Sequence, residues 1–312
     1  MKVIALAGGV GGAKMAWGLA QLLEVDQLSI IVNTGDDFEH LGLSISPDVD
    51  TVCYTLAGLA NPLTGWGRIE ETWNCFSELK KLGGPDWFGL GDKDLALHLE
   101  RTQLLKQGKT LSEVTSYLAN GMGIKHQVIP MSDQPVRTIV NTKEFGELPF
   151  QEYFVKHHCE PTMLSCRFDG IEKARLTESG RKSLESADVI IFCPSNPWVS
   201  IDPILEIEIV KQIISEKVAI AVSPIIGGKA IKGPAAKMYM EMGIVPSALA
   251  VAEHYNGLIR GIVIDNIDKN QMQQISRCGI IPIATQTIMS DNQTRETLAR
   301  ETILFAERFK KV

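Results

Sequence analysis

The chain has 312 residues, of which 45% are hydrophobic and 22% are charged, and its net charge at pH 7 is −6. This composition excludes a disordered or fibrous chain, and the length predicts two domains or one large α/β domain with an insertion. The acidic balance excludes a broad basic surface for nucleic acid or an anionic membrane, so an anionic ligand must be bound locally, by backbone amides, a few lysines or arginines, or a metal ion.

The N-terminal segment has the pattern of a β-α-β unit. A short apolar run predicts a buried strand over residues 2–7, glycines interrupt it at 8–12, and the spacing of apolar residues predicts a helix over 13–23. A second apolar run predicts a strand over 28–32. We expect the two strands to lie parallel and to be joined by a right-handed helical crossover.

The rest of the chain divides into a helical part and an alternating part. Helices are predicted over 48–59, 69–82, 93–107 and 111–119. Strands are predicted over 126–130, 136–141, 189–193, 218–222, 258–265 and 280–284, and further helices over 204–215, 234–242 and 296–309. The predicted fold is therefore α/β: a Rossmann-like, doubly wound, mostly parallel sheet formed by residues 1–46 and 124–312, with a mainly helical insertion over 47–123 and a smaller second subdomain. Ligands of such sheets bind beyond the carboxyl ends of the strands, so the loops that follow predicted strands are the candidate site.

The first of these loops, GGVGGAK at residues 8–14, is rich in glycine. Glycines let the backbone approach a phosphate closely, and the helix that follows offers unpaired amides, so the loop is a candidate phosphate cradle. It matches neither G-x-G-x-x-G nor the P-loop, which argues against a nicotinamide cofactor and against ordinary ATP hydrolysis. The alternative is a tight turn that binds no ligand.

The second loop, NTGDD at residues 33–37, carries two adjacent carboxylates. It stands about where the acidic residue of a Rossmann fold meets a ribose, but two carboxylates are more than a ribose needs and suit a divalent cation. The alternative is an Asx turn with a solvated acidic tip.

The third loop, SPDVDT at residues 46–51, opens a predicted helix. Asp48 is placed to cap the free amides of that helix, which is a purely structural role, while Asp50 points to a different side of it. Together with Asp36, these residues form a candidate carboxylate cluster that binds Mg²⁺ through oxygens and waters.

Two later loops also follow predicted strands. SPIIGGKAIKGP at 223–234 contains paired glycines and two lysines, and is either a second phosphate cradle or a crossover loop with solvated lysines. CPSNPW at 193–198 either offers small polar residues such as Asn196 to a flat polar ligand or forms a plain turn.

As a set, these loops resemble the 2-phospho-L-lactate transferase family of coenzyme F420 biosynthesis. The resemblance is carried by GGVGGAK (8–14), NTGDD (33–37), SPDVDT (46–51), WFGLGDKD (87–94), PMSD (130–133), FQEYFV (150–155), PSNP (194–197) and SPIIG (223–227). No single block is diagnostic, but eight blocks in the same order are specific, and they span most of the chain.

The resemblance implies a reaction, a cofactor and partners. In that family a hydroxy acid linked to guanosine diphosphate, such as lactyl-2-diphospho-5′-guanosine, donates its phosphoacid to the ribityl 5′-hydroxyl of the deazaflavin Fo, and GMP is released. Family members use Mg²⁺. We therefore expect an enzyme with these two small-molecule substrates, with neither a nucleic-acid nor a membrane partner, and with a homodimeric assembly. Six cysteines without C-x-x-C spacing fit a reducing cytoplasm better than a zinc site or a disulfide framework.

The resemblance also implies roles for particular residues. Asp36 and Asp48 are expected to hold Mg²⁺, and Asp50 to orient or deprotonate the Fo hydroxyl. The expected substrate-binding residues are Gly9, Gly11, Gly12, Lys14, Asn33, Asp50, Lys93, Asn196 and Lys229. At one position the chain departs from the family, which commonly has arginine where this sequence has Lys93, expected to contact the acceptor or a phosphate. The lysine keeps the charge and loses bidentate geometry, so the acid carried stays open among phospholactate, phosphoenolpyruvate and phosphoglycerate.

An alternative hypothesis comes from a different class of protein. Rossmann-like regulators resembling the gluconeogenesis factor bind nucleotide sugars without turnover and share the glycine-rich start. The long helical segment with its tryptophans, and FQEYFV at 150–155, argue against that class here.

Overall fold

A seven-stranded sheet forms the centre of the molecule in the computed structural model, which describes residues 1–310. Its strands are β1 (Val3–Ala7), β2 (Leu28–Val32), β5 (Gln127–Pro130), β9 (Val189–Phe192), β10 (Val218–Val222), β13 (Gly261–Asp265) and β14 (Ile281–Thr285). They lie in the order β14-β13-β10-β9-β1-β2-β5, and each neighbouring pair is parallel. The chain moves outward in one direction from β1 to β5 and in the other from β9 to β14, which is the doubly wound order of a Rossmann-like sheet. The predicted fold class is confirmed.

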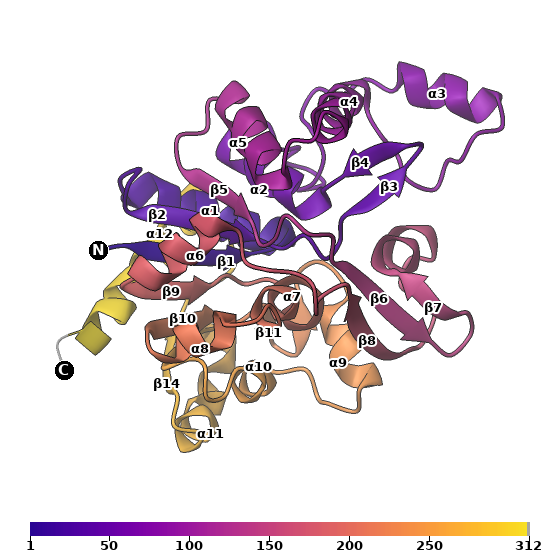
Figure 1. Cartoon of the computed structure of the whole chain (residues 1–312). Coiled ribbons are helices and arrows are strands. Elements are labelled where there is room, and N and C mark those ends of the chain that lie inside the picture. Colours follow the sequence, from indigo (N-terminus) through magenta and orange to yellow (C-terminus); the bar gives the residue numbers. More distant parts are fainter. Residues whose placement is uncertain (311–312) are drawn as a thin grey trace.

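Helices cover both faces of this sheet (Figure 1). Side chains alternate along β1, where Ala5 packs in one hydrophobic cluster and Leu6 in the other, and both are fully buried. The cluster around Ala5 includes residues of α1 (Gly9–Leu22), α2 (Pro47–Leu56), α5 (Leu111–Gly121) and α12 (Asn292–Glu307). The cluster around Leu6 includes residues of α6 (Glu178–Ser186), α7 (Asp202–Leu205), α8 (Val210–Ser215), α9 (Ala235–Glu241), α10 (Ala248–His254) and α11 (Met272–Arg277). Burial on both faces explains why these strands occur in the sequence as continuous apolar runs.

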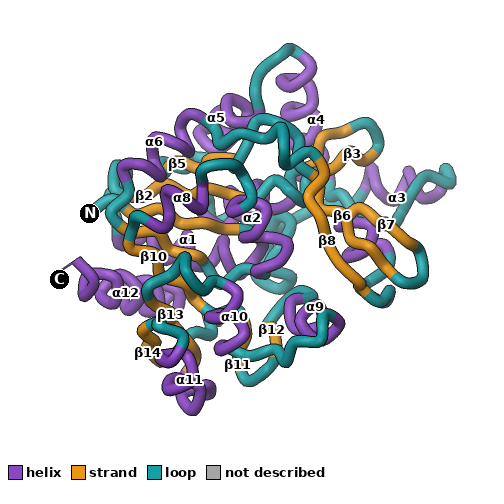
Figure 2. The backbone as a smooth tube through the Cα atoms, turned by 60° about the horizontal axis from the view of Figure 1, so that its bottom comes forward, coloured by secondary structure: helices purple, strands orange, loops and turns teal. Residues whose placement is uncertain are grey.

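The remaining elements lie outside the large sheet. The hairpin β3 (Phe38–His40) and β4 (Leu43–Ile45) leads into α2, and α3 (Asn74–Lys81) and α4 (Asp92–Lys106) follow. A separate antiparallel sheet has the order β7 (Gly146–Pro149), β6 (Arg137–Thr142) and β8 (Met163–Asp169). Figure 2 shows this small sheet beside the large one, and Figure 1 shows α3 projecting from the body of the molecule. A short hairpin of β11 (Ile225–Ile226) and β12 (Lys229–Ala230) completes the strands of the described residues.

Most predicted elements are present, with four informative differences. Helix α1 begins at Gly9, inside the glycine run, instead of at residue 13. The single helix predicted over 204–215 is split into α7 and α8, because Ile209 adopts a left-handed conformation with φ of 76°. The strand predicted over 136–141 pairs in the small sheet, and α10 was not predicted.

The division into a core (1–46 and 124–312) and an insertion (47–123) stays a prediction, and residues 311–312 lie outside the described part. Helix α2, inside the proposed insertion, packs closely on α1 through the cluster around Ala5. Over residues 1–310 the structure contains no helix with both the length and the apolar character needed to cross a membrane.

Candidate functional site

A cavity of about 720 Å³ opens at the carboxyl edge of the large sheet. It lies where the strand order reverses between β1 and β9, which is where ligands of doubly wound sheets bind. Loops that follow β1, β2, β9, β10 and β14 all contribute to it, and so do residues of α2, α4 and the small-sheet region. Seven predicted site residues line this cavity: Gly9, Gly11, Lys14, Asp36, Asp48, Asp50 and Asn196. Four do not line it: Gly12, Asn33, Lys93 and Lys229.

The glycine turn after β1 is held tightly against the loop after β9. A Cβ atom on Gly11 would lie 2.1 Å from the carbonyl oxygen of Pro194, and one on Gly12 would lie 2.5 Å from Ser195 Oγ. Both glycines are therefore required by packing. Because the first-turn amides of a helix have no partner inside it, the N–H groups of Val10 and Gly11, which also line the cavity, are available to an anion.

Asp48 ties the start of α2 to the glycine turn. Its Oδ1 accepts a hydrogen bond from the Gly9 N–H at 2.8 Å, and its Oδ2 accepts one from Asn33 Nδ2 at 2.9 Å. Asp48 therefore caps an amide of α1 across the site, whereas the structural alternative was a cap on its own helix. Asn33 is fully buried and acts through Asp48, which is why it does not reach the cavity.

Asp36 lies near Asp48, and both residues line the cavity. Burial, together with the charge of Asp48, raises the pKa of Asp36 well above its usual range, and burial raises the pKa of Asp48 to about 6. The Asp36 Oδ1 atom is buried and has no hydrogen-bond partner among the described residues. Two buried, mutually repelling carboxylates with an unpartnered oxygen are the chemistry expected where a cation neutralises them.

This pair fits a magnesium ion that also binds phosphate. Mg²⁺ is commonly held by one or two carboxylates, with waters and substrate phosphates completing its coordination. Within residues 1–310 the structure contains no group of three or more His, Cys, Asp or Glu side chains placed to hold a metal. Asp50 is accordingly not part of a three-carboxylate cluster with Asp36 and Asp48.

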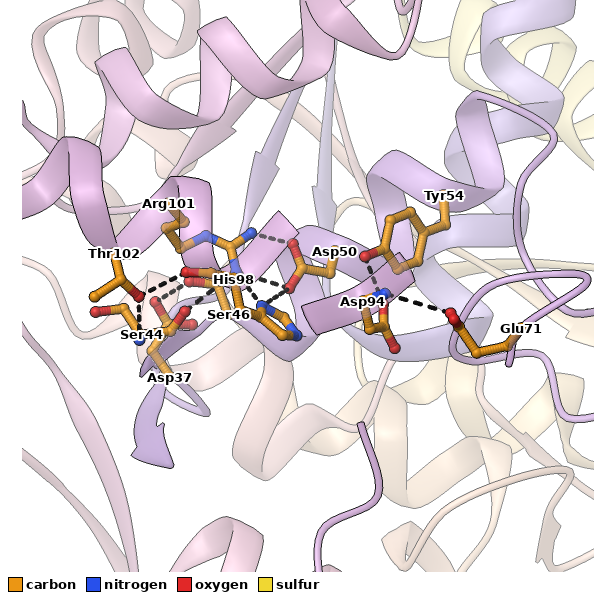
Figure 3. Close-up of polar contacts among 10 residues, drawn as sticks. All are labelled: Asp37, Ser44, Ser46, Asp50, Tyr54, Glu71, Asp94, His98, Arg101 and Thr102. Carbon is orange, nitrogen blue, oxygen red and sulfur yellow. Dashed lines mark hydrogen bonds and ion pairs between the residues drawn. The ribbon is translucent and has the colours of Figure 1, made fainter. Parts of the chain in front are cut away.

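Asp50 instead forms a buried ion pair with Arg101. Arg101 of α4 binds both of its carboxylate oxygens, with Nη1 3.0 Å from Oδ2 (Figure 3). The side chains of Arg101 and Asp50 are 2% and 9% exposed. His98 Nδ1 stands 3.8 Å from the same carboxylate, and burial lowers the pKa of His98 to about 4. The arrangement fixes Asp50 in the cavity wall with both of its oxygens already occupied.

Sequence reasoning misses Arg101, although a signal is present. Arg101 occupies the same face of α4 as Leu97 and Leu104, at i+4 and i+7 spacing, and all three are buried. An arginine on an apolar face needs an acidic partner, but the sequence does not say which one.

Two lysines, Lys14 and Lys232, line the cavity. Lys14 Nζ donates a hydrogen bond to the Met289 carbonyl at 2.7 Å, and its pKa is lowered by burial and by the nearby charges of Arg295 and Lys232. Lys232 lines the cavity and donates a hydrogen bond to the Thr64 carbonyl, so it joins the loop after β12 to the loop after α2.

The paired glycines of the 223–234 loop are a hairpin turn. Gly227 and Gly228, with φ of 56° and 76°, connect β11 to β12 as a two-residue loop, and Asp268 Oδ2 accepts the Gly227 N–H at 3.0 Å. This accounts for the glycines without a phosphate. Lys229 stands in the hairpin and is exposed, so Lys232 is the lysine of this loop that lies at the cavity.

Lys93 and Asn196 occupy different kinds of position. Lys93 has its Nζ 4.0 Å from Glu70 Oε2 in a largely exposed pair, outside the cavity lining. Asn196 lines the cavity, and its Oδ1 accepts the Trp198 N–H at 3.1 Å. That contact shapes the turn after β9 and leaves the side-chain amide beside Met238.

Aromatic side chains form another part of the wall. Trp87 and Phe88 lie with ring centroids 5.6 Å apart, and Phe150 and Phe154 stack with centroids 5.5 Å apart and planes at 8°. All four line the same cavity as the glycine turn. Such surfaces bind flat, partly apolar rings.

Asp94 and Tyr54 complete the polar lining. The Tyr54 hydroxyl donates to Asp94 Oδ1 at 2.6 Å, and both residues line the cavity (Figure 3). In the sequence Asp94 stands only as the last residue of the WFGLGDKD block, and nothing there assigns it a role.

The sheet order, the glycine turn at the switch point and the buried acid pair define a Rossmann-like α/β protein whose site is suited to a phosphate-bearing ligand. The family model described as 2-phospho-L-lactate transferase CofD matches residues 3–303. The chain belongs to this family, and it is a transferase.

Individual relatives agree with this assignment and differ in name. The phosphoenolpyruvate transferase of Streptomyces griseus is 39% identical over 98% of this chain and 99% of its own length. The 2-phospho-L-lactate transferase of Methanocaldococcus jannaschii is 37% identical over 97% of each chain. A crystal structure of a UPF0052 family protein from Bacillus halodurans is similar in fold, with a TM-score of 0.62 and 14% identity over 97% of this chain and all of that one.

Proposed function

We propose that this transferase moves a phosphorylated hydroxy-acid group from a guanosine diphosphate-linked donor to the ribityl 5′-hydroxyl of the deazaflavin Fo, in coenzyme F420 biosynthesis. The acceptor oxygen forms a bond to the phosphorus that carries the acid, and the bridging P–O bond breaks. GMP leaves, and the hydroxyl proton passes to a base. The membership of the CofD family supports this chemistry.

One structural observation supports it most strongly. A single cavity holds an anion-binding floor, made by the glycine turn and the lysines, and an aromatic wall. The floor suits a diphosphate, and the wall suits a planar tricyclic ring. A donor and an acceptor of these two kinds would meet inside the same 720 Å³ space.

The chain's own residues then have defined tasks. The N–H groups of Val10 and Gly11 bind the diphosphate, while Lys14 and Lys232 offset its charge. Asp36 and Asp48 would hold Mg²⁺. When bound, this ion would supply Lewis-acid stabilisation of the charge that develops on the leaving GMP phosphate. Arg101 keeps Asp50 in a single orientation in the wall, where it contacts the acceptor.

The acid carried is proposed only as a class. Relatives named phosphoenolpyruvate transferase and relatives named 2-phospho-L-lactate transferase are similarly close to this chain, at 39% and 37% identity. Lys93 stands outside the cavity lining, so it offers no direct basis for choosing among the three candidate acids. The regulator hypothesis has no support from the relatives, which carry transferase names.

The test is product analysis by mass spectrometry. The protein is incubated with Fo, Mg²⁺ and, in separate reactions, the guanosine diphosphate derivatives of phospholactate, phosphoenolpyruvate and phosphoglycerate. The expected result is GMP and a phosphodiester of Fo from one donor in preference to the others. Formation of no phosphodiester from any donor, with a nucleotide sugar bound and not converted, would instead favour a regulator.

A further inference from the structure

Four carboxylates line the cavity, and they differ in which of their oxygens are free. They are Asp36, Asp48, Asp50 and Asp94. Asp48 accepts hydrogen bonds on both oxygens, from Gly9 and Asn33. Asp50 is bound on both oxygens by Arg101.

Asp36 has an oxygen without a hydrogen-bond partner among the described residues, Oδ1, but that atom is buried and belongs to the proposed metal site. Asp94 has one bound oxygen and one free oxygen that is not buried, so it alone of the four offers an accessible free oxygen outside the metal site. Its Oδ1 accepts the Tyr54 hydroxyl at 2.6 Å, which fixes the orientation of the carboxylate. Its Oδ2 accepts no hydrogen bond from the residues that the structure describes, and it is the atom that a Cβ built on Gly67 would meet, at 3.9 Å. Gly67 lines the cavity too, so the free oxygen of Asp94 faces space that a substrate can enter.

The position of Asp94 relative to the rest of the site suits contact with the acceptor. Asp94 lies in the first turn of α4, close after Trp87 and Phe88 in the chain, and these aromatic residues line the same cavity. Asp48 accepts a hydrogen bond from the glycine turn and Asp36 lies near Asp48, so this pair lies on the diphosphate side of the cavity. The free carboxylate oxygen is thus associated with the part of the wall suited to the ring-bearing substrate.

We propose that Asp94 is the proton acceptor for the hydroxyl of the acceptor substrate. This inference rests on the proposed function, because it requires an alcohol as nucleophile. As the new O–P bond forms and the bridging P–O bond to GMP breaks, the hydroxyl proton moves to Asp94 Oδ2, and it is released to solvent after the products leave. Tyr54 is a positioning residue that holds Oδ1 and leaves Oδ2 free.

The electrostatic surroundings give Asp94 a suitable proton affinity. Burial raises the pKa of Asp94 to about 6, the Tyr54 hydrogen bond and the charge of Arg68 oppose the rise, and the charges of Asp50 and Glu71 add to it. These groups come from α2 and from the segment between α2 and α3, the elements packed against this side chain. A carboxylate with this pKa is mostly ionised at pH 7 and is a stronger base than an ordinary aspartate.

The test compares Asp94→Asn with the wild-type enzyme in the phosphodiester assay across pH 5 to 9. For the wild type, kcat should rise with pH and be half-maximal near the pKa of about 6, since the ionised form is the base. For Asp94→Asn, kcat should fall by about 100-fold or more and lose this limb, while the Kd for GDP stays within about threefold. Glu100→Gln, on the same helix outside the cavity, is the matched control and should behave as wild type.

A Tyr54→Phe variant tests the positioning role of Tyr54, because a purely structural role would leave the pH dependence of kcat unchanged. Loss of its hydrogen bond should shift the rising limb to higher pH, with kcat at pH 9 within about fivefold of wild type. An Asp94→Asn enzyme with near-normal kcat, or with the wild-type pH limb intact, would overturn the inference. If the wild-type protein forms no product from any donor, the proposed function fails and this inference fails with it; if only the variant result is contrary, the proposed function stands.

Discussion

The ion pair between Arg101 and Asp50 gives the most direct test of how the site is built. Replacing Arg101 by methionine keeps an unbranched side chain of similar length in the core and removes the charge. The Asp50 carboxylate would then remain buried with its strongest partner gone, because Arg101 binds both of its oxygens.

The size of the effect follows from burial. With side chains 2% and 9% exposed, the pair belongs to the class whose disruption costs about 3–5 kcal/mol, whereas exposed pairs are worth about 0–1 kcal/mol. We therefore expect Arg101→Met to lower the free energy of unfolding by about 3–5 kcal/mol. Since a folded domain has roughly 5–15 kcal/mol in total, the variant should still fold at low temperature.

A double-mutant cycle tests whether the unpaired Asp50 charge causes the loss of stability. Adding Asp50→Asn to Arg101→Met removes the orphaned charge, so the double variant should recover about half or more of the lost stability. Urea unfolding followed by circular dichroism measures the free energy of unfolding of the wild type, of both single variants and of the double variant. A loss below about 1 kcal/mol for Arg101→Met, or a double variant as unstable as the sum of the single ones, would refute the reasoning.

Three further predictions concern the cavity floor. Lys232→Ala should weaken GDP binding by about tenfold in titration calorimetry, because it removes a charge at the cavity. Lys229→Ala, the matched control in the exposed hairpin, should leave GDP binding unchanged, and equal effects of the two variants would contradict the placement of Lys232 in the binding site. Gly11→Ala should cost more than about 2 kcal/mol of stability and abolish GDP binding, because the new methyl group would lie 2.1 Å from the Pro194 carbonyl; normal stability would show that this contact relaxes easily. Asp36→Asn should raise the unfolding free energy of the metal-free protein by about 1–3 kcal/mol at pH 8, because the raised pKa means that the ionised form is disfavoured in the folded state. The gain should vanish at pH 4, and Mg²⁺ with GDP should no longer stabilise the variant; an unchanged response to Mg²⁺ would remove Asp36 from the metal site.

The fold is predictable because its signals are local. Each central strand is a short apolar run, and the residues that follow β1 and β2 are the glycines and acids of the site. A sheet that is buried on both faces requires such runs, and the carboxyl ends of parallel strands place their loops at one edge. For this reason Gly9, Asp36 and Asp48 are expected at the same edge of the sheet, and all three line the cavity.

The pairing of side chains is not predictable in the same way. Asp50 and Arg101 are 51 residues apart, and only the tertiary fold, which brings a side chain of α4 to one of α2, makes them partners. Asp48 pairs with Gly9 across 39 residues, so a residue with an obvious capping role at its own helix serves another helix. Periodicity reveals which face of an element is buried but carries no information on what lies opposite.

Which of the two lysines, Lys229 or Lys232, reaches the cavity depends on the geometry of the β11–β12 hairpin. The two glycines at 227–228 suit a phosphate cradle as far as their sequence goes, but their left-handed conformation makes them a two-residue hairpin loop. The hairpin holds Lys229 away from the cavity and leaves Lys232 to reach it. A pair of glycines in a sequence is compatible with both a phosphate cradle and a hairpin turn.

The central claim is that the glycine turn and the paired acids bind a diphosphate and its metal in one cavity. A crystal structure of the protein with GDP and Mg²⁺ tests it most directly. We expect phosphate oxygens on the N–H groups of Val10 and Gly11, with the metal between Asp36 and Asp48. A diphosphate bound outside this cavity, with Asp36 and Asp48 contacting neither metal nor nucleotide, would contradict it.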